Sequence, residues 1–370
     1  MKEQSKRIIK ILALLIMSSV CLYAGHFLLP EKNESEARRV KQAFPVKYEK
    51  VSFTSNGRKQ QGNILEIDVS GGNAEVKPVL SYDSVFGYES LSSIASRTNA
   101  YAAVNAGFFY LYGLPAGMVM IDGELIRNST GDYPVLAIEG NKASLKELRT
   151  NQYLVCGKRH IKLDGVNSQG EKGKTVLYTK WYGSSNRAQG KNITVTIVDG
   201  KVADIGRKSG ETDIPDNGML LTVYGDSLQY TDLKQGDEVK FEYSPYLGKK
   251  AQCYECGSWI VRNGKVVIGK YDKWIGITTN NDPRTAVGID KSGKIILLTV
   301  DGRQPGYSYG MTGKELGQFL LSKGIENAAM LDGGASTEMI VKGKIVNRPS
   351  YGGQERPLGG GLVVKVRDGK

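Results

Sequence analysis

The stretches WIVRNGKVVI (259–268) and MIVKGKIV (339–346) each place a two-residue turn, Asn-Gly or Lys-Gly, between runs of apolar and β-branched residues. This pattern is typical of a tight β-hairpin, because such a turn lets the chain reverse direction between two strands. Asp122-Gly123 and Asp199-Gly200 stand in the same setting. Hairpins join strands that run in opposite directions, so the sequence predicts antiparallel pairing rather than a repeated strand–helix–strand array.

Only two segments have a helical pattern. From Gly313 to Lys323 apolar residues recur at helical spacing, and Thr312 with Glu315 forms a capping box before them. A shorter helix is expected over 91–97, with Ser90 as its N-cap. Many strands with few helices predict an α+β fold built on a large mixed or antiparallel sheet.

The N-terminal segment has the composition of a membrane anchor. Four positive residues within the first ten precede an apolar run over 8–29, and about 20 apolar residues suffice to cross a bilayer as a helix. Positive charge before the run keeps that end in the cytoplasm, so we expect a single-pass protein of the cell membrane with its C-terminal domain outside. A cleaved signal peptide is the alternative, although Leu22-Tyr23-Ala24 is a poor cleavage site.

These patterns divide the chain into three parts. We expect a cytoplasmic basic flank and anchor over 1–30, a charged linker or stalk over 31–55, and one exported domain over 56–368. Residues 164–174, rich in Gly and Lys, are expected to form an exposed loop.

The net charge of +12 is unevenly spread. The first 50 residues hold ten Lys or Arg and five Asp or Glu, which leaves +7 on the exported part. Such a charge indicates either a solvated surface or attraction to an anionic envelope polymer. Nucleic acid is excluded as a partner, because an exported chain rarely meets it and no aromatic–basic recognition pattern is present.

Three cysteines, Cys156, Cys253 and Cys256, lie in the exported part, and Cys21 lies in the anchor. A single Cys-x-x-Cys pair without a second ligand pair argues against structural zinc. The remaining possibilities for these cysteines are a disulfide or free thiols. Outside the cell we expect Cys253 and Cys256 to be oxidised, with each other or with Cys156.

Polar clusters stand where apolar strands are expected to end or begin, over 105–109, 281–285, 301–303 and 332–337. Strand ends present functional groups from a rigid scaffold. Glycine beside Asp and hydroxyl residues lets backbone N–H groups approach an anion closely.

Four side chains in these clusters suit cleavage of a sugar phosphate. Arg284 and Arg303 have planar forks that match phosphate, and Asp301 and Asp332 are candidates for the two carboxylates of glycosidic cleavage. The simpler interpretation is that each Asp-Gly is only a turn. That interpretation is weaker for Asp332, which two glycines and two hydroxyl residues follow.

The ordered motifs of the chain resemble the phosphodiester glycosidase family, which includes the lysosomal uncovering enzyme and bacterial relatives. The likeness covers about residues 60 to 366 and rests on five stretches: YAAVNAGFF (101–109), PRTAVGID (283–290), LLTVDGRQPGYSYGMTGKEL (297–316), NAAMLDGGASTEMIVKGKIVNRPS (327–350) and ERPLGGGLVV (355–364).

The resemblance implies a hydrolase that cleaves a sugar from a sugar-1-phosphodiester, with a carbohydrate-phosphate substrate in envelope glycopolymers or exopolysaccharide. It places the catalytic groups at Asp301, Asp332, Arg303 and Arg284. It places substrate-binding residues at Asn105, Gly107, Gly333, Gly334, Ser336, Thr337, Asn347 and Arg356. No cofactor is certain, and a divalent cation, if present, would bind Asp301 and Asp332.

The sequence departs from the family pattern at three positions. Ala335 stands where the family has a third glycine, Glu338 where it has a Thr or an apolar residue, and Ala106 where Gly is common. Two alternatives stay open. One is a metal-assisted phosphodiesterase that cuts P–O instead of C–O, with Asp301 and Asp332 as cation ligands. The other, which the departures at Ala335 and Glu338 favour, is a glycopolymer-binding envelope protein without catalysis.

Overall fold

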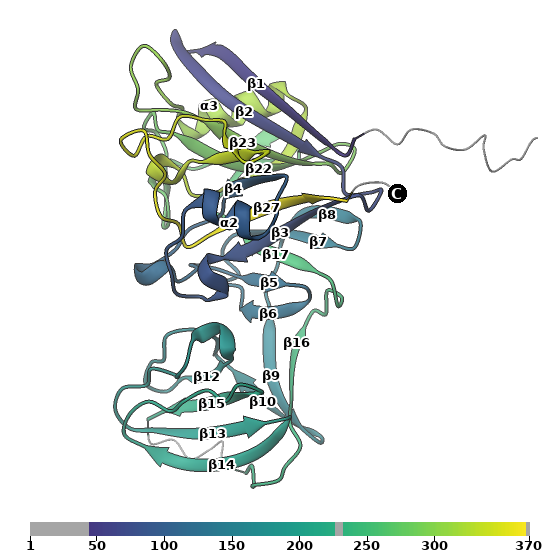
Figure 1. Cartoon of the computed structure of the whole chain (residues 1–370), viewed down its shortest axis with the longest axis vertical. Helices are drawn as coiled ribbons and strands as arrows, with labels where there is room; N and C mark the ends of the chain where they lie inside the picture. The colour runs from purple at the N-terminus through teal and green to yellow at the C-terminus, as the bar shows by residue number, and fades with distance from the viewer. Residues whose placement is uncertain (1–43, 226–231, 368–370) are drawn as a thin grey trace, which may run out of the picture. The chain divides into compact units, whose positions relative to one another are not determined.

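Antiparallel strands make up most of the computed structural model, which describes residues 44–225 and 232–367 (Figure 1). The largest sheet has seven strands in the order β1-β2-β23-β22-β24-β18-β19. Their bounds are Val46–Ser55, Arg58–Ile67, Ile295–Val300, Arg284–Asp290, Ile325–Met330, Trp259–Arg262 and Lys265–Val266. Every neighbouring pair in this sheet is antiparallel, as the hairpin pattern predicts.

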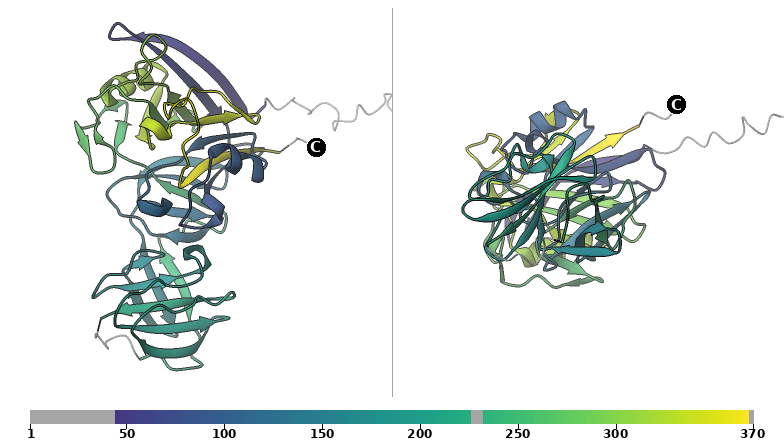
Figure 2. Two further views of the ribbon diagram at one scale, coloured as in Figure 1. Left: turned by 60° about the vertical axis from the view of Figure 1, so that its left-hand side comes forward. Right: turned by 90° about the horizontal axis from the view of Figure 1, so that it is seen from below.

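A second sheet pairs the last strand of the described chain with two strands from its first third. Its order is β26-β25-β4-β27-β3, with bounds Lys344–Ile345, Met339–Val341, Ala102–Asn105, Gly360–Val366 and Ala74–Leu80. In Figures 1 and 2 the yellow β27 lies between the blue β4 and β3. This pairing brings the motif of residues 101–109 next to the C-terminal motifs.

The remaining strands form four smaller sheets. One has the order β6-β5-β17-β7-β8, with bounds Glu124–Arg127, Val119–Ile121, Gln252–Glu255, Pro134–Glu139 and Lys142–Glu147. Another has the order β11-β12-β15-β13-β14, with bounds Gly165–Val166, Thr175–Tyr178, Gly218–Tyr224, Asn192–Val198 and Lys201–Lys208. The last two are β10-β9-β16 (Arg159–Leu163, Asn151–Cys156, Lys240–Ser244) and β20-β21 (Tyr271–Asp272, Gly276–Ile277). The protein is therefore sheet-rich with few helices, but its strands form several sheets instead of one large sheet.

Both predicted helices are present. α2 spans Leu91–Arg97, and its N-cap Ser90 accepts a hydrogen bond from the backbone N–H of Ser93. α3 spans Gly313–Ser322 and has the predicted capping box of Thr312 and Glu315. Helix α3 buries Leu316 and Leu320 against apolar residues of the seven-stranded sheet.

The predicted hairpin turns are also present, and each has a left-handed backbone at both turn residues. The φ angles are 50° and 78° at Asp122-Gly123, and 49° and 71° at Asn263-Gly264. A further turn of the same kind, Asn56-Gly57, joins β1 to β2. The linker predicted over 31–55 is therefore placed too far along the chain, because Val46–Ser55 is a strand with ten residues paired to β2.

Among residues 44–225 and 232–367, no helix is long and apolar enough to cross a membrane. The anchor predicted over 8–29, and the part of the linker before residue 44, lie outside the described residues.

The expected oxidation of Cys253 and Cys256 is wrong for this structure, in which these two thiols and that of Cys156 are free and buried. Successive side chains of a strand point to opposite faces. Cys253 and Cys256, separated by an odd number of positions, accordingly pack in different apolar clusters, and Cys156 packs in a third. Burial raises the pKa of Cys253 and of Cys256 to about 12, so both thiols stay protonated and unreactive.

Candidate active site

A cavity of about 230 Å³ lies where the seven-stranded sheet meets the end of β4. Strand β22 is antiparallel to both β23 and β24, so its first residue, Arg284, lies beside the last residue of β23 and near the end of β24. Asn105, the last residue of β4, joins the second sheet to this edge, because its Nδ2 donates to the backbone oxygen of Asp332 (2.6 Å). The cavity is lined by Phe108, Trp274, Ile275, Asp282, Arg284, Arg303, Asp332, Gly333, Gly334, Ala335 and Arg356.

Arg284 is a buried cation held mainly by carbonyl groups. Its Nε donates to the backbone oxygen of Met311 (2.8 Å) and its Nη2 to that of Asn280 (2.7 Å). Burial lowers its pKa, and the nearby Asp282 carboxylate opposes that effect. Arg284 therefore contributes a fixed positive charge whose position the backbone determines.

Arg303 reaches the cavity from the loop after β23, with its side chain half exposed. Its Nε donates to Asp282 Oδ1 (2.9 Å), and the other oxygen of Asp282 lies 3.9 Å from Arg284 Nη2. Asp282 thus orients two arginines at once. A carboxylate with two cationic neighbours is itself a poor candidate for the reacting group, because its charge is already committed.

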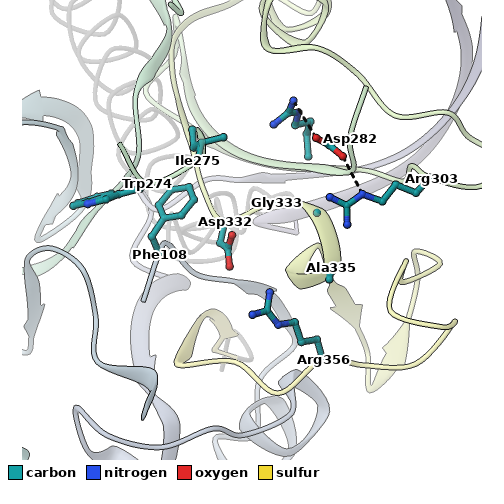
Figure 3. Close-up of a pocket in the computed structure, with 11 residues that line it drawn as sticks. Phe108, Trp274, Ile275, Asp282, Arg303, Asp332, Gly333, Ala335 and Arg356 are labelled. Carbon is teal, nitrogen blue, oxygen red and sulfur yellow. Dashed lines mark hydrogen bonds and ion pairs between the residues drawn. The ribbon is translucent and has the colours of Figure 1, made fainter. Parts of the chain in front are cut away.

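Asp332 is the other carboxylate of the cavity, and it has a different environment. Burial raises the pKa of Asp332 to about 6, against the lowering effects of a Ser336 hydrogen bond and the Arg356 charge. No ion pair of Asp332 occurs within 4.0 Å among the described residues. The carboxyl group therefore titrates near neutral pH and faces the cavity (Figure 3).

The residues after Asp332 form a tight 3₁₀ turn over Gly334–Ser336. Gly334 has a φ of 58°, and a Cβ there would lie 3.2 Å from Arg303 Nη2. Glycine therefore lets this turn lie against the guanidinium group. Ser336 is buried, and its Oγ accepts a hydrogen bond from Arg356 Nη1 (2.9 Å).

An aromatic wall closes the cavity on the side away from the arginines. The ring of Trp274 lies 5.7 Å from that of Phe108 and 4.1 Å from that of Tyr133, measured between centroids. Asp272 Oδ1 fixes this loop by accepting from the backbone N–H groups of Trp274 (2.7 Å) and Ile275 (2.8 Å). In Figure 3 Asp332 lies between Phe108 and the guanidinium groups of Arg303 and Arg356.

The structure therefore brings six of the predicted residues to one cavity: Arg284, Arg303, Asp332, Gly333, Gly334 and Arg356. Asn105 does not line it but supports it from behind. Its Oδ1 accepts from Thr285 Oγ1 (2.9 Å) and from the backbone N–H of Glu338 (3.1 Å), and this side chain ties three segments together.

Asp301 does not line the cavity. The structure therefore does not support its predicted role as the second carboxylate of glycosidic cleavage. Asp301 is 1% exposed. Asn347 Nδ2 (3.1 Å), the Arg348 backbone N–H (3.1 Å) and Tyr307 Oη (3.2 Å) all donate to its oxygens. A carboxylate with its acceptor positions filled in this way ties the loop after β23 to the backbone of residues 347–348.

Three residues predicted to bind substrate also have packing roles. Asn347 is buried, and its Nδ2 donates to the backbone oxygen of Thr337 (2.9 Å) as well as to Asp301. Thr337 is 1% exposed, and its Oγ1 lies 3.3 Å from Thr285 Oγ1. Gly107 gives room to Tyr254, because a Cβ at this glycine would lie 2.7 Å from the ring.

A divalent cation shared by Asp301 and Asp332 does not fit this arrangement. The oxygens of Asp301 are occupied by protein donors, and Asp332 faces a cavity lined by three arginines. In residues 44–225 and 232–367, no group of three His, Cys, Asp or Glu side chains could hold a metal ion.

Sequence reasoning gave no role to five residues that line the cavity. Phe108 and Asp282 lie inside motifs that the sequence marks, at the end of β4 and the start of β22. Trp274 and Ile275 lie in a loop between two-residue strands with no motif of its own. Ala335 stands out in the sequence only as a departure from the family's glycine.

Comparison with known proteins agrees with these motifs. The family model for phosphodiester glycosidases matches residues 192–365, which confirms the resemblance. Over 106 residues the chain is 31% identical to N-acetylglucosamine-1-phosphodiester alpha-N-acetylglucosaminidase of Bos taurus, covering 25% of this chain and 19% of that protein. It is 34% identical over 112 residues to an SPbeta prophage-derived uncharacterized protein of Bacillus subtilis, covering 30% and 17%. The matches thus span about a fifth of these curated relatives.

Two solved structures share the fold. A hypothetical protein from Synechocystis superposes with a TM-score of 0.75 at 20% identity, covering 87% of this chain and 62% of that one. A putative exported protein from Burkholderia pseudomallei gives a TM-score of 0.69 at 23% identity, covering 84% and 75%.

Proposed function

Since residues 192–365 match the phosphodiester glycosidase family, we propose that this protein is a hydrolase that cleaves the bond between the anomeric carbon of a sugar and a phosphodiester. The observation that carries the proposal is the position of Asp332, between an aromatic wall and a set of arginines. Each side of the cavity suits one half of such a substrate.

The arginine side suits the phosphodiester. Arg303 and Arg356 present guanidinium forks at the cavity, and Arg284 adds a buried charge. Planar forks match phosphate oxygens, and fixed cations stabilise the negative charge that builds up on a departing phosphodiester. Because that leaving group is already a weak base, the reaction has little need of a strong general acid.

The aromatic side suits the sugar. Phe108 and Trp274 offer apolar ring surface next to the carboxyl group of Asp332. As the C–O bond breaks, positive charge develops at the ring. The Asp332 carboxylate stabilises that charge, and it attacks the anomeric carbon or removes a proton from the attacking water. Both roles require the ionised form.

Hydrolysis in water enriched in oxygen-18 tests the proposal. The substrate is the methyl phosphodiester of N-acetylglucosamine-1-phosphate, with Asp332→Asn as the matched inactive control. Cleavage of C–O places the label in the sugar. Label in the phosphate would instead establish the phosphodiesterase alternative. Binding of the substrate without turnover would support the alternative of a glycopolymer-binding protein.

The cellular setting belongs to the same proposal. The basic flank and apolar run over 8–29, with the +7 charge of residues 51–370, support a cell-membrane protein that acts outside the cell on an anionic envelope glycopolymer. Protease added to intact cells should then degrade the domain, and complete protection of the domain would refute this location.

A further inference from the structure

A second cavity, of about 370 Å³, lies between the sheet β11-β12-β15-β13-β14 and the turn that follows Phe109. Tyr110, Arg127, Asp164, Gln169, Glu171 and Lys174 are among the residues that line it. It includes much of the Gly- and Lys-rich loop over 164–174, to which the cleavage reaction assigns no role.

This cavity is adjacent to the active site along the chain. Phe108 lines the first cavity and Tyr110 lines the second, and two residues span at most about 7 Å of backbone. Phe109, between them, lies with its ring 5.6 Å from the guanidinium carbon of Arg356. The two cavities are thus separated by a single residue along the chain, Phe109.

The polar groups of the second cavity include both donors and acceptors. Arg127 is the main donor: its Nη1 donates to the backbone oxygen of Asn167 (3.0 Å), and it makes no ion pair within the described chain. Asp164 and Glu171 supply carboxylate acceptors, and Gln169 supplies one of each kind. Lys174 Nζ lies 3.8 Å from Asp164 Oδ1. The two cations, Arg127 and Lys174, balance the two carboxylates, so the lining has no net charge.

Such a lining suits hydroxyl groups, which donate and accept at once. A phosphate or carboxylate only accepts, and Asp164 and Glu171 would repel it. Tyr110 adds an aromatic face, 51% exposed. The next turn holds this loop in place: Tyr112 has a left-handed backbone (φ 63°), and its carbonyl accepts from the N–H of Gly87 (2.8 Å). An exposed aromatic on a strained, pinned turn is the arrangement expected at a binding surface.

We propose that the cavity lined by Tyr110, Arg127 and Asp164 is a second sugar-binding site, which holds a neutral sugar of the glycan attached to the cleaved phosphodiester. The sugar stacks on Tyr110, and its hydroxyl groups pair with Arg127, Asp164 and Gln169. The proposal rests on the proposed function for its biological purpose, but not for its test.

The test uses neutral hexasaccharides without phosphate, so that binding does not depend on hydrolysis. Chitohexaose, cellohexaose, maltohexaose and mannohexaose are titrated into the whole chain by calorimetry. At least one should bind, and Tyr110→Ala should weaken that binding by about tenfold, the scale of one lost aromatic contact. Gln169→Ala should weaken it less. Tyr112→Ala is the matched control, because this tyrosine is 70% exposed in the same turn and lines neither cavity. The affinity of this variant for the saccharide should stay within twofold of the wild-type value.

Three results would overturn the proposal: no binding of any of the four saccharides, equal weakening by Tyr110→Ala and Tyr112→Ala, or binding of inorganic phosphate that Arg127→Gln abolishes while the saccharides do not compete. If the oxygen-18 experiment shows no hydrolysis but a hexasaccharide binds in the Tyr110-dependent way, the second site stands and only the proposed reaction fails.

Discussion

At the scale of single residues, Asp332 and Asp282 show how one cavity separates two carboxylates by their surroundings. Asp282 lies 2.9 Å from Arg303 and 3.9 Å from Arg284, whereas burial raises the pKa of Asp332 to about 6. Asp332→Asn keeps the shape and removes the charge. We expect it to lower kcat by about a hundredfold or more, the scale of a positioned acid, base or nucleophile. Circular dichroism should show an intact fold, and near-normal turnover in this variant would exclude the assignment.

The raised pKa of Asp332 sets the pH range in which activity should change, and its role sets the direction of that change. In the proposed reaction the carboxylate is the active form, and it is lost as the pH falls below about 6. A profile of kcat/KM against pH should therefore rise through about 6 and then level off. Activity that instead declines as the pH rises through this range would make Asp332 the proton donor.

Glu338 is a buried carboxyl group near the site, and it affects stability more directly than catalysis. Its Oε1 accepts from the backbone N–H of Arg356 (2.6 Å), while its Oε2 has no hydrogen-bond partner within the described chain. Burial raises the pKa of Glu338 to about 8. The folded protein thus holds this proton more tightly than the unfolded chain does, so stability is lost as the pH rises from about 4.5 towards 8.

Glu338→Gln removes that dependence, because the amide never ionises. We expect the variant to be more stable than the wild type at pH 8.5, by on the order of 4 kcal/mol, and within about 1 kcal/mol of it at pH 5. Urea unfolding at the two pH values measures the difference. Glu238→Gln, at a side chain 81% exposed, is the control and should show no such trend. A constant difference between Glu338→Gln and wild type would contradict the pKa assignment.

At the scale of strands and loops, the sequence predicts the edge where the cavity forms but not which side chains enter it. The hairpin turns and helix caps act locally, so α2, α3 and the paired strands follow from a few residues each. Asp301 and Asp332 each stand at or just beyond a strand end before a glycine, and nothing local distinguishes them. The difference comes from segments far along the chain: residues 347 and 348 donate to Asp301, 46 and 47 positions away.

Two further features of the structure, strand β1 and the position of Trp274, depend on contacts that the local sequence pattern does not indicate. β1 (46–55) is a sheet-edge strand that exposes three charged side chains, two of them consecutive at Glu49 and Lys50, so its sequence resembles a linker. Trp274 enters the cavity because Asp272 folds its loop back, and one aspartate in an irregular loop gives no periodic signal.

The loop contacts of Asp301 lead to a prediction about stability. Asp301→Asn replaces one acceptor oxygen with a donor NH₂ that faces Asn347 Nδ2, the Arg348 N–H or Tyr307 Oη, all of which donate. We expect a loss of about 1–3 kcal/mol in unfolding free energy, the cost of an unsatisfied buried group. At a temperature where the variant is folded, kcat should fall far less than in Asp332→Asn. A full loss of turnover in a stable, folded Asp301→Asn protein would restore Asp301 to the catalytic machinery.

At the scale of the whole molecule, two apolar clusters share one strand. On β12 Val176 and Tyr178 face a cluster that also includes Leu65, Val104 and Leu297 from other sheets. Leu177, between them, faces the opposite way into a cluster whose buried residues all lie between positions 154 and 239. Successive side chains of β12 point to opposite faces, so this one strand packs against both the core of residues 154–239 and the core beneath the candidate active site.

This coupling predicts one cooperative unfolding transition for the part of the chain that the two clusters hold. Leu177→Ala removes a fully buried side chain and should cost about 2–5 kcal/mol. Calorimetry should show a single heat-absorption peak that moves to lower temperature as a whole. Hydrogen exchange under mild denaturant should show amides of β13 and β15 opening together with those of β22 and β23. If the variant instead gives an early separate peak, with β13 and β15 exchanging while β22 and β23 stay protected, the 154–239 core unfolds on its own. In that case the second sugar site would be lost at temperatures where the cavity around Asp332 remains intact.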